Sequence, residues 1–318
     1  MDTQGNRPAP FRKWIIAARP FSLSASAMPV LFGTAMAVAI GGAEFHPWRF
    51  LAALAGMVML HSGANILSDI SDFNKGLDIA VTPVSGAIVR GLINTQEAFV
   101  AAASLLFTGS LLGVVLVMLT GWPLLAIGLA GLLIGVCYTV GPALKYRALG
   151  DLAVFLDFGI LGAVGSWMVQ TGSPSWAPAI WSVPMSLLVV GILHANNWRD
   201  IAGDTGKSIR TVASMLGDRG SLAYYGFLIF APYAIVMGMI VATRLFRLGP
   251  VMPLTFLATL LALPLSLKLW RRARQRATPT HPFDFVALDG ATAQLNLLFG
   301  LLCAVAVLLR PLLARWTS

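Results

Sequence analysis

Long apolar stretches alternate with short polar breaks along most of the chain. Nine stretches are predicted to cross a bilayer as helices, near residues 22–42, 48–70, 97–120, 122–142, 150–171, 178–200, 222–243, 249–270 and 290–314. A hydrocarbon core of about 30 Å requires about 20 apolar residues per helix. In lipid, unbroken apolar stretches of this length satisfy their backbone hydrogen bonds as helices. We therefore predict an all-α integral membrane domain of nine transmembrane helices over residues 22–316, preceded by a cytoplasmic segment over residues 1–21.

The composition excludes a water-soluble globular domain. Of the 318 residues, 57% are apolar and 11% are charged, whereas about a quarter of the residues in a typical soluble domain are charged. Disordered, collagen-like and coiled-coil chains require a polar or strictly periodic composition that this sequence lacks. Cys137 and Cys303 both lie in apolar stretches, so the sequence offers neither a disulfide framework nor a paired-cysteine metal site.

Most positive charges fall on one side of the predicted membrane. With the N-terminus placed in the cytoplasm, all but five of the 22 Lys and Arg residues lie on the cytoplasmic side, as is usual for inner loops. The net charge of +9 therefore reflects topology and not affinity for nucleic acid. We expect a multi-pass protein of the inner (cytoplasmic) membrane with its C-terminus outside. The basic run over residues 271–276 is expected to contact anionic membrane lipids.

Two clusters of Asp and Asn residues occur where the second and the sixth stretches end. The first contains Asn65, Asp69 and Asp72, and the second contains Asn196, Asn197, Asp200 and Asp204. Spacings of three and four residues place side chains along one face of a helix. Both stretches run toward the cytoplasm in the predicted topology, so both clusters emerge at the same surface. We predict that they face one another across a shared site.

These clusters predict a site for Mg²⁺ and a diphosphate. Carboxylate and amide oxygens suit Mg²⁺ better than zinc or copper, and Mg²⁺ is usually shared with substrate phosphates. The predicted metal ligands are Asn65, Asp69, Asp72, Asp200 and Asp204. Positive charge on a leaving diphosphate favours cleavage of its C–O bond, which indicates ionisation of an allylic diphosphate. A cation-coupled transporter is the alternative, but transporter sites lie near the bilayer midplane.

Basic residues on the same side are candidate contacts for the phosphate oxygens. They are Lys75, Arg90, Lys145, Arg199, Lys207 and Arg210. Cytoplasmic placement alone explains Lys75, Arg90, Lys145 and Arg210 equally well. Asp157 lies about 10 Å into the fifth stretch at 1.5 Å per residue. There it would bind or deprotonate an acceptor hydroxyl, or form a hydrogen bond to a neighbouring helix. Tyr138 would face a carbocation or belong to an interfacial aromatic belt.

At these residues the sequence resembles the UbiA superfamily of intramembrane prenyltransferases. Asn65, Asp69, Asp72, Gly76 and Asp78 match the pattern NxxxDxxDxxxGxD of its 1,4-dihydroxy-2-naphthoate polyprenyltransferase branch. Further similar segments begin at Arg19, Ser85, Tyr138 and Thr292. The resemblance implies a nine-helix bundle with a central cavity. It also implies Mg²⁺-dependent transfer of a polyprenyl group to 1,4-dihydroxy-2-naphthoate, with decarboxylation to demethylmenaquinone in menaquinone (quinone) biosynthesis, and it suggests Asp78 as a ligand contributed by a loop.

The second cluster departs from the pattern of that branch. Ser208 and Ile209 stand where the branch usually has Gly-Lys, whereas Gly206-Lys207 comes earlier and Thr211 keeps its place. Arg210 would then take over a phosphate contact. The acceptor therefore stays open between 1,4-dihydroxy-2-naphthoate and another hydroxynaphthoate, a hydroxybenzoate, a tetrapyrrole or a lipid headgroup.

Overall fold

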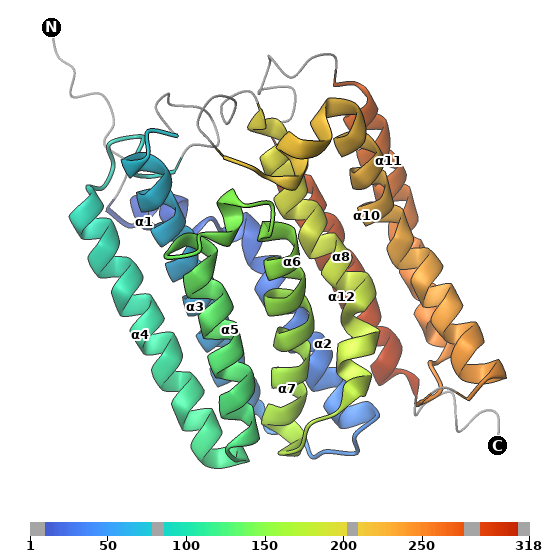
Figure 1. Ribbon diagram of the computed structural model, residues 1–318. Helices are drawn as coiled ribbons and strands as arrows, with labels where there is room; N and C mark the ends of the chain where they lie inside the picture. Colours follow the sequence, from blue (N-terminus) through green and yellow to red (C-terminus); the bar gives the residue numbers. More distant parts are fainter. Residues whose placement is uncertain (1–9, 78–85, 202–208, 248, 277–286, 311–318) are drawn as a thin grey trace, which may run out of the picture.

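A computed structural model describes residues 10–77, 86–201, 209–247, 249–276 and 287–310. Over these ranges the chain forms long helices that run side by side in one bundle (Figure 1). The helices are α1 (Pro10–Ala18), α2 (Ser24–Ala39), α3 (Pro47–Asn74), α4 (Thr95–Thr120), α5 (Pro123–Thr139), α6 (Gly150–Val154), α7 (Gly162–Thr171), α8 (Trp176–Arg199), α10 (Val212–Leu245), α11 (Leu263–Arg274) and α12 (Leu288–Leu308). Shorter elements are η1 (Pro20–Leu23), η2 (Leu144–Tyr146), the π-helical η3 (Phe155–Leu161) and the 3₁₀-helical η4 (Leu254–Ala262).

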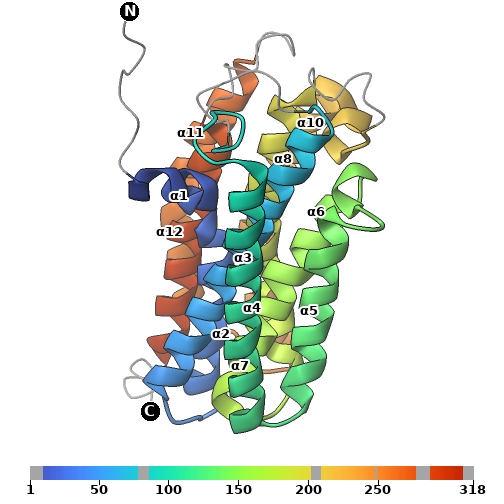
Figure 2. The same ribbon diagram turned by 90° about the vertical axis from the view of Figure 1, so that its left-hand side faces the viewer.

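These elements form a multi-pass membrane protein. Eight helical segments of the described chain are long and apolar enough to cross a bilayer, and α5 is a shorter apolar helix. Each of the nine predicted stretches corresponds to one of these segments, with η3 joining α6 to α7 and η4 leading into α11. The all-α prediction is confirmed. Helix α1 lies across one end of the bundle (Figure 2), and α12 ends at the other (Figure 1).

Local sequence signals explain where several helices begin and end. Asn94 and Glu97 form a capping box at the start of α4, and Thr211 and Ser214 form one at the start of α10. Pro123 occupies the first turn of α5, where a missing backbone N–H costs nothing. Helix α10 begins ten residues before the apolar stretch at 222–243 because its polar first turns are also helical, with a break at Gly217.

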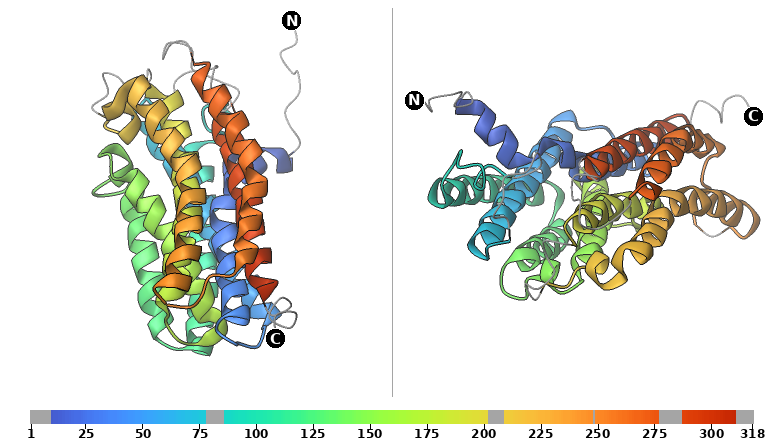
Figure 3. Two further views of the ribbon diagram at one scale, coloured as in Figure 1. Left: turned by 90° about the vertical axis from the view of Figure 1, so that its right-hand side faces the viewer. Right: turned by 90° about the horizontal axis from the view of Figure 1, so that it is seen from above.

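Close helix packing depends on small residues. A Cβ atom on Gly109 of α4 would lie 3.0 Å from the carbonyl oxygen of Gly56 in α3, and one on Gly33 of α2 would overlap the backbone of Ala163 in α7. Such contacts stabilise helix pairs in lipid, where apolar burial provides little driving force. The view from above shows α4 at one edge of the bundle and α10 with α11 at the opposite edge (Figure 3).

The basic run at the end of α11 does not point uniformly outward. Arg271, Arg272 and Arg274 are partly or largely exposed, as expected for residues that contact lipid headgroups. Arg276 is buried and forms an ion pair with Asp218 of α10, with its Nε 2.8 Å from Oδ1. The prediction of lipid contact for Arg276 is therefore wrong. Asp218 is 58 residues away in the chain, so inspection of the basic run alone could not reveal its partner.

Candidate active site

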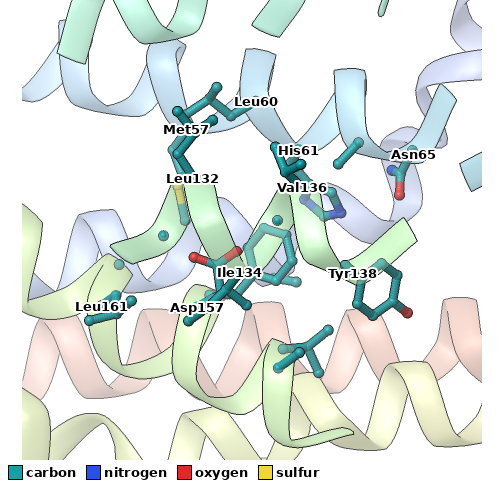
Figure 4. Close-up of a pocket in the computed structure, with 18 of the residues that line it drawn as sticks. Met57, Leu60, His61, Asn65, Leu132, Ile134, Val136, Tyr138, Asp157 and Leu161 are labelled. Carbon is teal, nitrogen blue, oxygen red and sulfur yellow. The ribbon is translucent and has the colours of Figure 1, made fainter. Parts of the chain in front are cut away.

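A cavity of about 820 Å³ opens among α2, α3, α4, α5, the segment from α6 to α7, and α8. Its walls are mostly apolar, and its polar residues gather where α3 and α8 end. The predicted site residues that line it are Asn65, Asp72, Tyr138, Lys145, Asp157, Asn196, Asn197 and Asp200. The two polar clusters therefore border one cavity, although they belong to helices that are distant in the sequence. Figure 4 shows part of the lining, with His61 and Asn65 on α3 and Tyr138 on α5.

Asp72 is held by the turn that follows α5. Lys145 Nζ donates to both of its carboxylate oxygens at 2.8 and 3.0 Å, and the Tyr146 hydroxyl donates to Oδ1 at 2.7 Å. Lys145 also donates to Ser68 Oγ, one turn earlier in α3, at 2.6 Å. Burial lowers the pKa of the Lys145 ammonium, and the opposing effect of the neighbouring Asp72 carboxylate offsets only part of this decrease. Burial and Asp72 both raise the pKa of the Tyr146 phenol, which therefore remains a hydrogen-bond donor.

Asp69 does not line the cavity, although its partner Arg19 does. Its carboxylate is buried and forms an ion pair with Arg19, which follows α1 in a left-handed backbone conformation. Asp69 is not among the residues that line the cavity, so its role as a metal ligand stays a prediction. On the same helix, Asn65 lines the cavity and donates to Ser22 Oγ at 3.2 Å.

The second cluster is organised around Arg199. The Arg199 guanidinium donates to both carboxylate oxygens of Asp200 at 2.9 and 3.1 Å, and to Asn196 Oδ1 at 2.6 Å. It also donates to Asp289 Oδ2 at the start of α12 at 2.8 Å. The side chains of Arg199 and Asp289 are 7% and 4% exposed, whereas that of Asp200 is 42% exposed. A buried cation thus holds a carboxylate and an amide at the edge of the cavity.

Of the other predicted basic contacts, Lys75, Arg90 and Arg210 are described, and they do not line the cavity. Lys75 Nζ lies 3.6 Å from the centre of the Tyr146 ring, and Arg90 lies in a turn that precedes α4. The Arg210 side chain is exposed, and its backbone pairs with the turn after α5 through Arg210 N–H to Tyr146 O at 3.0 Å. The predicted residues Asp78, Asp204 and Lys207 lie outside the described residues.

The donor chemistry at this end of the cavity fits Mg²⁺. The lining carboxylates of Asp72 and Asp200 and the amides of Asn65 and Asn196 supply hard oxygen donors. Within the described ranges, no group of three or more His, Cys, Asp or Glu side chains lies close enough to hold a metal ion by itself. Sparse protein ligands are typical of Mg²⁺ sites that a substrate phosphate completes.

Comparison with known proteins identifies the family of this chain. The UbiA prenyltransferase family matches residues 26–288 of the chain. The chain belongs to the UbiA prenyltransferase family. "UbiA prenyltransferase domain-containing protein 1" of Danio rerio is 32% identical over 301 residues, which cover 94% of this chain and 84% of the relative. That name specifies no acceptor, so the expected membership of the menaquinone branch stays a proposal.

Solved structures support the same fold for this prenyltransferase. A UbiA homolog from Aeropyrum pernix K1 superimposes with a TM-score of 0.62 at 17% identity, covering 91% of this chain and 98% of the other. A UbiA homolog from Archaeoglobus fulgidus, bound to DMAPP and Mg²⁺, gives a TM-score of 0.59 at 14% identity, covering 93% and 99%. Because the chain belongs to a family of enzymes, an enzyme is favoured over the alternative of a cation-coupled transporter.

Sequence reasoning missed several residues that organise the site of this prenyltransferase. Tyr146 and Ser68 were not predicted to contact Asp72, and Asp289 was not connected with the second cluster. Asp289 offered one signal, because it is the acidic residue at the start of the last apolar stretch. Its pairing with Arg199 depends on how α8 and α12 are rotated toward each other, which the sequence pattern does not encode.

Gly86 is expected to be required for the position of Asp69. A Cβ atom at residue 86 would lie 2.2 Å from Asp69 Oδ2, so Gly86→Ala should displace the carboxylate or the turn that carries Gly86. We expect at least about a tenfold loss of prenyl transfer, a typical effect of misplacing a group at an active site. The measurement is kcat/KM of the purified variant. Gly238→Ala is the control, since nothing lies within 4 Å of a Cβ there, and equal activity in both variants would contradict the prediction.

Proposed function

We propose that the protein transfers a polyprenyl group from an allylic diphosphate to an aromatic acceptor, with Mg²⁺ as cofactor. One observation carries the proposal: Asp72 and Asp200, from the two Asp-containing clusters, border a single apolar cavity. The Archaeoglobus fulgidus relative bound to DMAPP and Mg²⁺ supports the ligand chemistry. The diphosphate binds where α3 and α8 end, and the prenyl chain extends into the apolar part of the cavity.

Different residues of this chain would bind the metal, the diphosphate and the prenyl chain. Asn65, Asp72, Asn196 and Asp200 would hold the metal, together with the predicted ligands Asp69 and Asp204. Bound Mg²⁺ supplies positive charge that stabilises the leaving diphosphate. Lys145 lines the cavity beside Asp72 and adds a cation at the same end. The apolar walls exclude water that would otherwise quench the allylic cation.

The reaction forms a carbon–carbon bond as the allylic C–O bond breaks. The ring carbon of the acceptor attacks the prenyl carbon, the diphosphate leaves with the electron pair of the C–O bond, and the ring then loses a proton or a carboxyl group. We propose 1,4-dihydroxy-2-naphthoate as the acceptor, in which case the carboxyl group leaves as CO₂. The support for this acceptor is the spacing from Asn65 to Asp78.

The proposed location is a cytoplasmic membrane, with the acidic ends of α3 and α8 on the cytoplasmic side. Helix α1 and these two helix ends lie at the same end of the bundle (Figure 1). The excess of Lys and Arg in the connections at that end supports this orientation.

An assay with purified protein tests the function. The protein in detergent receives Mg²⁺, a radiolabelled polyprenyl diphosphate and, separately, 1,4-dihydroxy-2-naphthoate, other hydroxynaphthoates, a hydroxybenzoate, a tetrapyrrole and a lipid headgroup. We expect a prenylated aromatic product and stoichiometric release of diphosphate. EDTA should abolish turnover and added Mg²⁺ should restore it, because the oxygen donors match that ion. Full activity in EDTA would contradict the metal assignment, and a preference for another acceptor would replace the proposed one.

A further inference from the structure

Asp157 lies in an unusual segment of its membrane span. The segment Phe155–Leu161 is a π-helix between the α-helices α6 and α7. Single π-turns inside α-helices are rare and frequently occur at functional sites. The segment packs closely against α8, because a Cβ on Gly159 would lie 2.0 Å from Ser186 Oγ. The position of the π-turn is therefore set by close packing.

The Asp157 carboxyl group faces the cavity without a protein partner. It lines the cavity and is half-buried, and within the described part of the chain it makes no hydrogen bond or ion pair. Figure 4 shows it among the apolar side chains of Met57, Leu132 and Leu161. A polar group in such surroundings costs free energy unless a hydrogen-bonding partner is supplied. Among the described residues, the Asp157 side chain therefore does not form the hydrogen bond to a neighbouring helix that was its alternative role.

Two glycines of α5 leave room beside this carboxyl group. A Cβ on Gly131 would lie 2.9 Å from Asp157 Oδ1, and one on Gly135 would lie 3.8 Å from Oδ2. A larger residue at position 131 would force the carboxyl group to move. The wall of the cavity opposite Asp157 is thus shaped to admit its side chain in this orientation.

Asp157 also lies at the depth where an acceptor must bind. The next residue, Phe158, packs against His61 with ring centres 4.4 Å apart. His61 is one helical turn deeper in α3 than Asn65, which belongs to the proposed diphosphate site. The reacting carbon of a prenyl diphosphate is bonded to a diphosphate oxygen. The acceptor ring must therefore lie next to the diphosphate, on the side that faces the interior of the cavity. A ring at that depth would lie beside Phe158, the residue next to Asp157.

We propose that Asp157 binds a ring hydroxyl of the aromatic acceptor and thereby selects hydroxylated acceptors. The inference rests on the proposed prenyl transfer and adds the residue that recognises the second substrate. The carboxyl group gains the hydrogen-bonding partner that the protein does not provide, and the acceptor gains a fixed orientation beside the prenyl carbon. An acceptor without that hydroxyl leaves the carboxyl group unpartnered and binds more weakly.

The test combines a change in the protein with a change in the acceptor. Wild type, Asp157→Leu and Asp157→Asn are assayed with the best acceptor of the panel and with analogues in which one ring hydroxyl is replaced by hydrogen. For one hydroxyl position we expect wild type to prefer the hydroxylated acceptor by at least about tenfold in kcat/KM, and Asp157→Leu to lose this preference. Asp157→Asn should retain much of it, because the amide can hydrogen bond to the same hydroxyl.

Separate readouts distinguish recognition from folding and from diphosphate binding. The KM for the prenyl diphosphate should match wild type, and the thermal stability of Asp157→Leu should be at least that of wild type, since no protein partner is lost and an unpartnered polar group leaves an apolar site. Leu161→Val, another change in the cavity lining, should leave the hydroxyl preference intact. An unchanged preference in Asp157→Leu, or an equal rise in both KM values, would overturn the inference while leaving prenyl transfer established. If wild type prenylates no acceptor of the panel, the proposed function fails and this inference fails with it.

Discussion

Replacing Asp200 by alanine is expected to reduce prenyl transfer by at least about a hundredfold, the usual effect of removing one preorganised electrostatic group. Asp200 borders the cavity, its side chain is 42% exposed, and it is a predicted metal ligand. The variant should still fold, because Arg199 keeps its buried ion pair with Asp289. The measurement is kcat at saturating Mg²⁺, together with the elution profile and thermal stability of the purified protein.

Glu97→Gln is the matched control for Asp200→Ala. Glu97 lies in the first turn of α4, does not line the cavity, and completes a capping box that Gln can also form. Both substitutions remove one negative charge. If Glu97→Gln lost as much activity as Asp200→Ala, the general charge of this surface would explain the effect. Wild-type activity in Asp200→Ala would refute its role at the metal.

Replacing Arg199 by methionine is expected to cause the largest loss of stability. The substitution leaves the buried Asp289 carboxylate, 4% exposed, without its cation. Removing one partner of a buried ion pair costs about 3–5 kcal/mol. Activity should fall as well, because Asn196 and Asp200 lose the guanidinium that orients them. Thermal unfolding in detergent measures the first effect, and the transfer assay measures the second.

A double substitution separates the two effects. Arg199→Met combined with Asp289→Asn removes both charges, so most of the lost stability should return. Activity should stay low, since Asn196 and Asp200 still lack their hydrogen-bond donor. If the double variant were as unstable as Arg199→Met, the ion pair would not account for the loss. If it were fully active, Arg199 would not position the second cluster.

Much of the fold was predictable because membrane spans carry a strong local signal. The nine apolar stretches correspond to the observed helical segments, and the shared end of α3 and α8 followed from counting spans. As the helical spacing predicted, Asn65 and Asp72 line the cavity together, and so do Asn196 and Asp200, but Asp69, which was expected on the same face as Asn65, does not. These predictions needed only the length, the periodicity and the direction of the helices.

The contacts between helices were not predictable in the same way. A helix that is apolar on every side does not reveal which face meets which neighbour. The pairing of Asp69 with Arg19 and that of Arg199 with Asp289 depend on that rotation. The π-turn that carries Asp157 is also a product of packing, because Gly159 fits against Ser186 in α8.

The backbone pairing between the turn after α5 and Arg210, two residues before α10, has a consequence for engineering. Arg210 accepts from Ala148 N–H at 2.5 Å and donates to Tyr146 O at 3.0 Å, and Tyr146 in turn holds Asp72. Two backbone hydrogen bonds therefore join these two connections at the end of the bundle where α3 and α8 end. A chimera that imports only one of these connections from a homologue would break the link and release Asp72. Exchanging both connections as a pair should preserve it.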